Sequence, residues 1–183
     1  MQQFLIYFFI ALGLSMDAFS LAIAFGTNKL SIKKELLLSA FVGIFHYIMP
    51  LLGTLLGVKL NFIIHGSNIL VGMIFLILAA EMYTSIGEEK KGIITNFLSI
   101  IFFSFTVSID SFSVGIALGI TQNYSHLAFL TFSLVSATLT LTGLLVGKYL
   151  SQKLEKKAIY FGIAILILLS IKYIFFNWFT EFT

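Results

Sequence analysis

The chain has 183 residues, of which 59% are hydrophobic and 10% are charged, and its formal net charge is +3. A soluble domain carries roughly 25% charged residues, so this composition excludes a water-soluble globular fold and indicates a polytopic membrane protein. The chain contains no cysteine, which disfavours disulfides and thiolate-bound metals such as copper. The positive charge reflects lysines expected in loops, so it does not indicate nucleic-acid binding.

Six apolar segments are long enough to cross a bilayer as helices. In chain order they span residues 3–26, 36–58, 66–86, 94–120, 127–147 and 159–179. No positively charged side chain precedes the first segment and Asp17 lies inside it, so we expect a retained helix rather than a cleaved signal peptide. The predicted fold class is therefore all-α, with six transmembrane helices and no separate soluble domain.

The lysines fall almost entirely on one side of these predicted helices. Nine of them follow the first, third and fifth segments, whereas the other side has Lys59 and Lys172. Because cytoplasmic loops carry the excess of positive charge, we expect these three loops in the cytoplasm and both termini outside. Trp178 and Tyr173 suit the outer aromatic belt, and the Lys172 side chain is long enough to extend toward the same interface.

A twelve-residue motif occurs twice in the chain. Residues 15–26, SMDAFSLAIAFG, return as residues 108–119, SIDSFSVGIALG, with mostly conservative differences. The similarity extends beyond the motif, because the glycines of residues 53–57 recur at 143–147. These glycine pairs are interpreted as helix-packing faces.

The repetition predicts two three-helix units within one integrated membrane domain, residues 1–93 and 94–183. Each unit has an odd number of helices, so the second unit enters the membrane from the opposite face. Inverted repeats of this kind are typical of secondary transporters.

Each motif places one carboxylate inside an apolar helix, where an ionised group is costly and indicates a functional site. At about 1.5 Å per residue, Asp17 lies about 20 Å below the outer face, near the middle of a ~30 Å hydrocarbon core. Asp110 reaches a similar depth, and an inverted repeat would make the two aspartates face each other. At helical spacing, Ser20 shares the face of Asp17, and Thr106 and Ser113 share the face of Asp110.

The second segment adds His46, four residues before the only proline, Pro50. A proline inside a helix frees the carbonyl four residues earlier, so the carbonyl or the imidazole of His46 could reach the aspartates. The alternative is that Pro50 only kinks the helix and His46 bonds a neighbour. Glu81 in the third segment is either a ligand on the exit path or a carboxylate turned toward cytoplasmic water.

Two midplane carboxylates with hydroxyls and carbonyls form an oxygen-rich site, suited to a hard or borderline divalent cation such as Mn²⁺ or Mg²⁺. Two negative charges would balance the ion and remove much of the cost of burying each charge alone. The alternative is an aspartate pair that shares a proton and joins two helices.

The segment Ser15-Met16-Asp17-Ala18-Phe19-Ser20, its partner at residues 108–113 and the Pro50-Leu51-Leu52-Gly53 segment resemble the bacterial manganese efflux pump family (MntP-like). The resemblance covers all six segments. It implies an inner-membrane exporter that removes excess Mn²⁺ from the cytoplasm, with Asp17 and Asp110 at the family's acidic positions. Related sporulation membrane proteins share the aspartate motif, which leaves open an exporter of another divalent cation or a non-transporting membrane protein. The segment 45–50 favours manganese, and no metal role is carried onto Glu81 or Lys172.

Export of a divalent cation against an inside-negative potential costs about 4.6 kcal/mol per 100 mV, from roughly 2.3 kcal/mol per charge. The sequence has no Walker motif, so we expect ion exchange by alternating access, most simply with protons. Manganese is then a transported substrate rather than a cofactor. An intramembrane aspartyl protease also uses two aspartates, but Asp110 lacks the Gly-x-Gly-Asp setting of such enzymes, so no enzymatic activity is expected.

Overall fold

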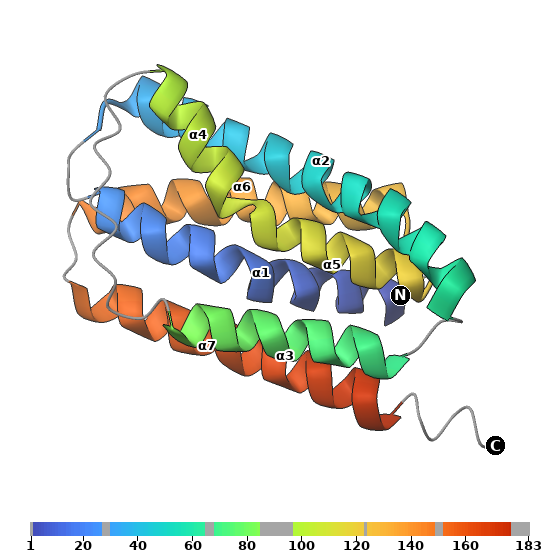
Figure 1. Ribbon diagram of the computed structural model, residues 1–183. Coiled ribbons are helices and arrows are strands. Elements are labelled where there is room, and N and C mark those ends of the chain that lie inside the picture. Colours follow the sequence, from blue (N-terminus) through green and yellow to red (C-terminus); the bar gives the residue numbers. More distant parts are fainter. Residues whose placement is uncertain are drawn as a thin grey trace.

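A computed structural model shows the chain as an elongated bundle of helices that lie roughly along one long axis (Figure 1). The structure describes residues 2–26, 30–64, 68–84, 97–122, 124–148 and 152–176. Within these ranges all regular structure is helical. The helices are α1 (Gln2–Gly26), α2 (Ile32–Ile64), α3 (Asn68–Thr84), α4 (Phe97–Val107), α5 (Ile109–Ile120), α6 (His126–Gly147) and α7 (Gln152–Ile171), and the short η1 (Lys172–Phe176) continues α7.

The helices correspond to the six predicted membrane crossings, because α4 and α5 together form the fourth. Four stretches of the described residues are long and apolar enough to cross a membrane: Phe4–Gly26, Ile32–Leu60, Phe97–Ile120 and His126–Gly147. The third and sixth crossings contain shorter apolar helices, Val71–Ala80 and Ile159–Ile174. The chain is therefore a multi-pass, all-helical membrane protein, as the sequence predicted.

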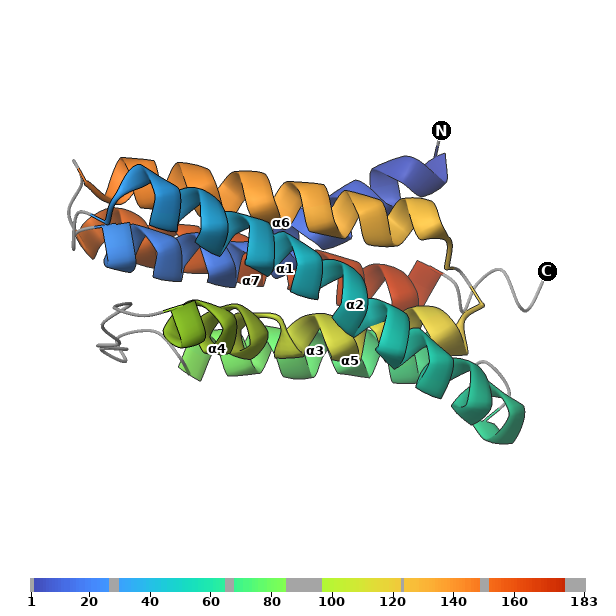
Figure 2. The same ribbon diagram turned by 90° about the horizontal axis from the view of Figure 1, so that it is seen from above.

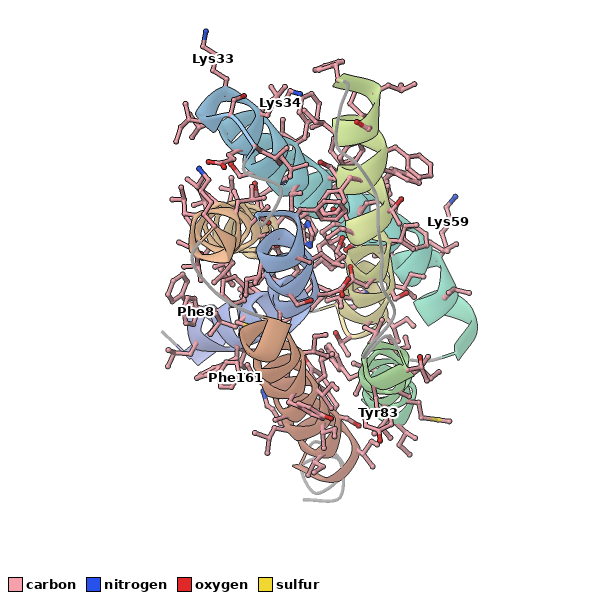
Figure 3. All side chains as sticks on the ribbon, turned by 90° about the vertical axis from the view of Figure 1, so that its left-hand side faces the viewer. Phe8, Lys33, Lys34, Lys59, Tyr83 and Phe161 are labelled. Carbon is pink, nitrogen blue, oxygen red and sulfur yellow. The ribbon has the colours of Figure 1, made fainter. Side chains whose placement is uncertain are left out.

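Large apolar side chains point outward around the bundle. In the end-on view of Figure 3, Phe8, Tyr83 and Phe161 project away from the helices, and each is more than a third exposed. Such a perimeter is unfavourable in water and suits contact with lipid.

The helices pack in two layers joined by α2. Figure 2 shows α1, α6 and α7 in one layer and α3, α4 and α5 in the other, with α2 crossing from the first to the second. The most extensive contacts join α1 to α6 and α2 to α5, followed by α1 with α7 and α2 with α6.

The glycine pairs lie where helix backbones approach most closely. A Cβ atom added at Gly53 of α2 would lie 2.1 Å from the carbonyl oxygen of Phe112 in α5. A Cβ atom added at Gly147 of α6 would lie 2.2 Å from the carbonyl oxygen of Ile23 in α1. Only glycine permits these approaches, so the interpretation of the glycine pairs as packing faces is confirmed.

The predicted continuous helix over 94–120 is wrong at Ser108, where the structure separates α4 from α5. The Ser108 amide donates to the Phe105 carbonyl at 3.1 Å, three residues back rather than four. The Ser108 hydroxyl donates a hydrogen bond to the Ser104 carbonyl at 2.7 Å, so this carbonyl is bonded by a side chain rather than by the Ser108 amide. The Ser111 hydroxyl donates in the same way to the Ser108 carbonyl. Serine hydroxyls that compete for backbone carbonyls in this way favour a helix interruption.

Candidate metal-binding site

The two aspartates lie on the helices that carry the repeated motif. Asp17 is partly buried in the second half of α1, and Asp110 is partly buried in the first turn of α5. The Asp110 Oδ1 atom accepts a hydrogen bond from the Ser111 amide at 2.7 Å.

The first serine of each motif bonds to a polar side chain on the helix that packs beside it. The Ser15 hydroxyl lies 2.6 Å from the Ser136 hydroxyl, which joins α1 to α6. The Ser108 hydroxyl lies 2.8 Å from Nδ1 of His46, which joins α5 to α2 at the helix interruption. The offset that aligns the two glycine pairs also aligns His46 with Ser136. Both motifs are therefore anchored by a buried polar contact between one half of the chain and the other.

The hydrogen bonds of His46 fix which ring nitrogen carries the hydrogen. His46 is fully buried, and its Nδ1 lies 3.0 Å from the carbonyl oxygen of Val42. A carbonyl only accepts, so Nδ1 carries the hydrogen, and the Ser108 oxygen accepts from it as well. A fully buried imidazolium would be costly, so the ring is neutral and Nε2 has a free lone pair. Within the described residues, Nε2 has no hydrogen-bond partner.

Pro50 lies against α5 rather than in an open cavity. A Cβ atom added at Gly115 would lie 2.2 Å from the Pro50 carbonyl oxygen. The same carbonyl accepts a hydrogen bond from the Thr54 hydroxyl at 2.7 Å. The proline turn of α2 is thus fixed to the α5 backbone just after Asp110.

The other predicted site residues have different surroundings. Ser20 is buried, and its hydroxyl donates to the backbone carbonyl of Asp17 at 3.0 Å. Ser113 is partly buried on α5. Thr106 is exposed, its hydroxyl donates to the Phe102 carbonyl at 2.8 Å, and the interruption at Ser108 separates its helix from that of Asp110.

No three His, Cys, Asp or Glu side chains gather into a metal-binding group among the described residues. A cation held by the aspartates would therefore be completed mainly by hydroxyl and carbonyl oxygens. The Glu81 side chain lies outside the described residues. The ammonium of Lys172 lies 5.5 Å from the centre of the Tyr173 ring, a cation–π contact within η1.

Sequence reasoning missed Ser108 as the point of interruption and Glu35 as a buried charge. Glu35, in the first turn of α2, is fully buried, and its Oε1 lies 2.7 Å from the Lys148 ammonium just after α6. The closely spaced hydroxyls of residues 104–111 were a signal in the sequence for the helix interruption at Ser108. No such signal indicated the burial of Glu35, because its partner lies more than a hundred residues away.

Residues 29–174 match a protein-family model described as "Putative manganese efflux pump". Among curated proteins, one named "Putative manganese efflux pump MntP" from Geobacillus thermodenitrificans is 35% identical over 170 residues, which is 90% of this chain and 92% of that protein. One of the same name from Bacillus thuringiensis subsp. konkukian is 38% identical over 155 residues, covering 81% of this chain and 83% of the relative. No solved structure matches. Because the family match and both relatives cover most of the sequence, the chain belongs to the MntP family.

Proposed function

We propose that this protein exports Mn²⁺ from the cytoplasm across the inner membrane, with Asp17 and Asp110 as the carboxylates that hold the ion. The observation that carries the proposal is the paired setting of these residues. Each aspartate is partly buried in an apolar helix. Each lies two residues after a serine whose hydroxyl bonds to a side chain in the other half of the chain. The relatives are named as manganese efflux pumps.

The same proposal makes the chain two inverted three-helix repeats, residues 1–93 and 94–183. The helix contacts support it, because α1 packs on α6 in the way that α5 packs on α2. The glycine pairs support it too, since each pair lies against the motif helix of the other half. Rocking of one repeat against the other would then expose the ion alternately to each side of the membrane.

The work of export is proposed to come from protons entering in exchange. Two carboxylates that share one site repel each other when both are ionised, so loss of the ion favours protonation of one of them. The lysine-rich end of the bundle is assigned to the cytoplasm, and the opposite end, with both termini, is assigned to the outside. In everted vesicles, Mn²⁺ uptake should rise when the vesicle lumen is made more acidic than the outside medium. Uptake at the same rate with and without this pH gradient would contradict proton coupling.

The export function is tested in a strain that lacks its own manganese exporter. The intact protein should restore growth in excess Mn²⁺ and lower the cellular manganese content, whereas Asp17→Ala and Asp110→Ala should do neither. Thr138→Ala is the matched control, because Thr138 is exposed and its hydroxyl donates to backbone carbonyls of its own helix. Full tolerance with either aspartate variant would remove that carboxylate from the site. If the strain tolerates every metal equally well with and without the protein, the result would instead favour a non-transporting membrane protein.

A further inference from the structure

A buried ion pair joins α2 to α6 at the lysine-rich end of the bundle, which is assigned to the cytoplasm. Glu35 is fully buried, and its Oε1 lies 2.7 Å from the ammonium of Lys148, which is partly exposed. The second carboxylate oxygen, Oε2, has no hydrogen-bond partner among the described residues. Because a buried carboxylate is costly without a countercharge, the burial of Glu35 depends on Lys148. The pair thus connects the first half of the chain to the second.

The helices around this pair close the same end of the bundle with apolar side chains. One cluster of buried residues draws on α1, α2, α4 and α6, and it includes Leu21, Phe25, Leu38, Ile100 and Leu144. Its α1 members follow Asp17 toward the cytoplasmic end, and its α4 members precede Asp110 along the chain. The cluster therefore lies on the cytoplasmic side of both aspartates. Passage of an ion through it requires these helices to separate.

The aligned positions at the opposite end of the bundle hold uncharged residues. The offset that aligns the two glycine pairs also aligns Glu35 with Ser125 and Lys148 with Val58. The Ser125 hydroxyl accepts a hydrogen bond from the Ala128 amide of its own helix. Figure 2 shows that α2 also leaves the layer of α6 toward this opposite end. At these positions, the two ends of the bundle are therefore held together differently.

An ion pair of this kind suits a contact that must form and break. The attraction within a buried pair is largely offset by the cost of removing both charges from water. If the cytoplasmic end opens, water solvates both charges, so their separation costs little. If Lys148 alone is removed, the closed state buries an unpaired carboxylate, which is strongly unfavourable. Removal of one charge should therefore favour the open state over the closed one.

We propose that the Glu35–Lys148 pair is a cytoplasmic gate, which holds this end closed and separates when an ion passes from the cytoplasm to the aspartates. The proposal rests on the proposed function, since it assumes transport by alternating access.

Thiol labelling tests the gate directly, because the chain contains no cysteine of its own. Ser39→Cys, a change of similar size, places one thiol on α2 a single turn after Glu35, at a position that is 5% exposed. In everted vesicles without Mn²⁺, a membrane-impermeant maleimide should label this thiol slowly. Lys148→Met should raise the labelling rate by at least about fivefold. Adding Glu35→Met should restore the slow rate, because the closed state then buries an apolar contact instead of a charge.

Lys33→Met is the matched control for the loss of a lysine. Lys33 lies in the same first turn of α2 but is exposed and points away from the helices (Figure 3). Its replacement should leave the labelling rate of Ser39→Cys unchanged. A rate that rises as much in Lys33→Met as in Lys148→Met would assign the effect to the charge of this end and overturn the gate.

A second thiol separates opening of the gate from a general loss of packing. Thr131→Cys lies near the outer end of α6 at a position that is 7% exposed, and right-side-out vesicles present that end to the maleimide. Its labelling rate should not rise in Lys148→Met. A rate that rises at both thiols, or at neither, would overturn the gate.

The labelling and the growth test in excess Mn²⁺ can fail separately. Labelling needs no Mn²⁺, so a failed gate in a protein that still restores growth would leave the export function standing. The expected labelling rates in a protein that does not restore growth would instead overturn the export of Mn²⁺ and leave the opening of this end standing.

Discussion

Replacing Gly53 by alanine should separate two helices that now touch through their backbones. The added Cβ would lie 2.1 Å from the Phe112 carbonyl oxygen, whereas carbon–oxygen contacts lie at about 3.3 Å or more. The helices must therefore move apart by about 1 Å, because neither contacting group is a side chain that can rotate away. Overpacking of this kind costs about 1–3 kcal/mol, and the better helix propensity of alanine returns about 0.5–1 kcal/mol. We expect a net loss of about 1–2 kcal/mol.

Thermal unfolding in detergent micelles measures the effect, which corresponds to a decrease in melting temperature of about 2–8 °C. Gly13→Ala is the comparison variant, because its Cβ would meet the Cγ2 of Ile165 at 2.9 Å, a longer contact that involves a side-chain atom rather than a backbone atom. Gly13→Ala should therefore lower the melting temperature less than Gly53→Ala. Gly147→Ala, whose Cβ would lie 2.2 Å from the Ile23 carbonyl oxygen, should resemble Gly53→Ala. Equal stability of Gly53→Ala and Gly13→Ala would refute the close approach of α2 and α5.

Two further predictions concern polar contacts between helices. Lys148→Met should destabilise the protein by about 2–3 kcal/mol, less than the roughly 3–5 kcal/mol of a fully buried pair, because the Lys148 side chain is 23% exposed. Adding Glu35→Gln to Lys148→Met should recover part of this loss in thermal unfolding, and strictly additive effects would argue against the ion pair. Ser170→Ala removes the hydroxyl that donates to the Gly72 carbonyl at 2.8 Å between α7 and α3, at a cost of about 0.6 kcal/mol. In the same assay Thr138→Ala, which removes a hydroxyl bonded within its own exposed helix surface, should cost less, and the reverse order would contradict the α3–α7 contact.

The six crossings could be predicted from the sequence because each is a long apolar segment that can be recognised from its own residues alone. The role of the glycine pairs was also predictable, since small residues at a spacing of four mark close packing between membrane helices. The interruption at Ser108 was missed for a physical reason. The aligned Ser15 sits in an unbroken α1, so the first serine of the motif does not set the break by itself. At the break the Ser108 hydroxyl bonds the Ser104 backbone carbonyl, and the Ser111 hydroxyl, which has no counterpart at the aligned Ala18, bonds the Ser108 carbonyl.

The candidate site was only partly predictable. The aspartates are conspicuous because a carboxylate is rare in an apolar helix. The state of His46 depends on Val42 of its own helix and on Ser108, which lies 62 positions away, and only the three-dimensional structure shows which ring nitrogen is left free. The Glu35–Lys148 pair is likewise a contact between distant segments, so no local pattern indicated it.

Equilibrium binding of Mn²⁺ to the purified protein tests the central claim most directly, with Asp17→Asn and Asp110→Asn as variants that keep the side-chain shape and remove the charge. If both carboxylates hold the same ion, each substitution alone should weaken Mn²⁺ binding by at least about tenfold. Their combination should weaken it little further, because the first loss already destroys the site. Binding of unchanged affinity in either single variant would contradict a shared site.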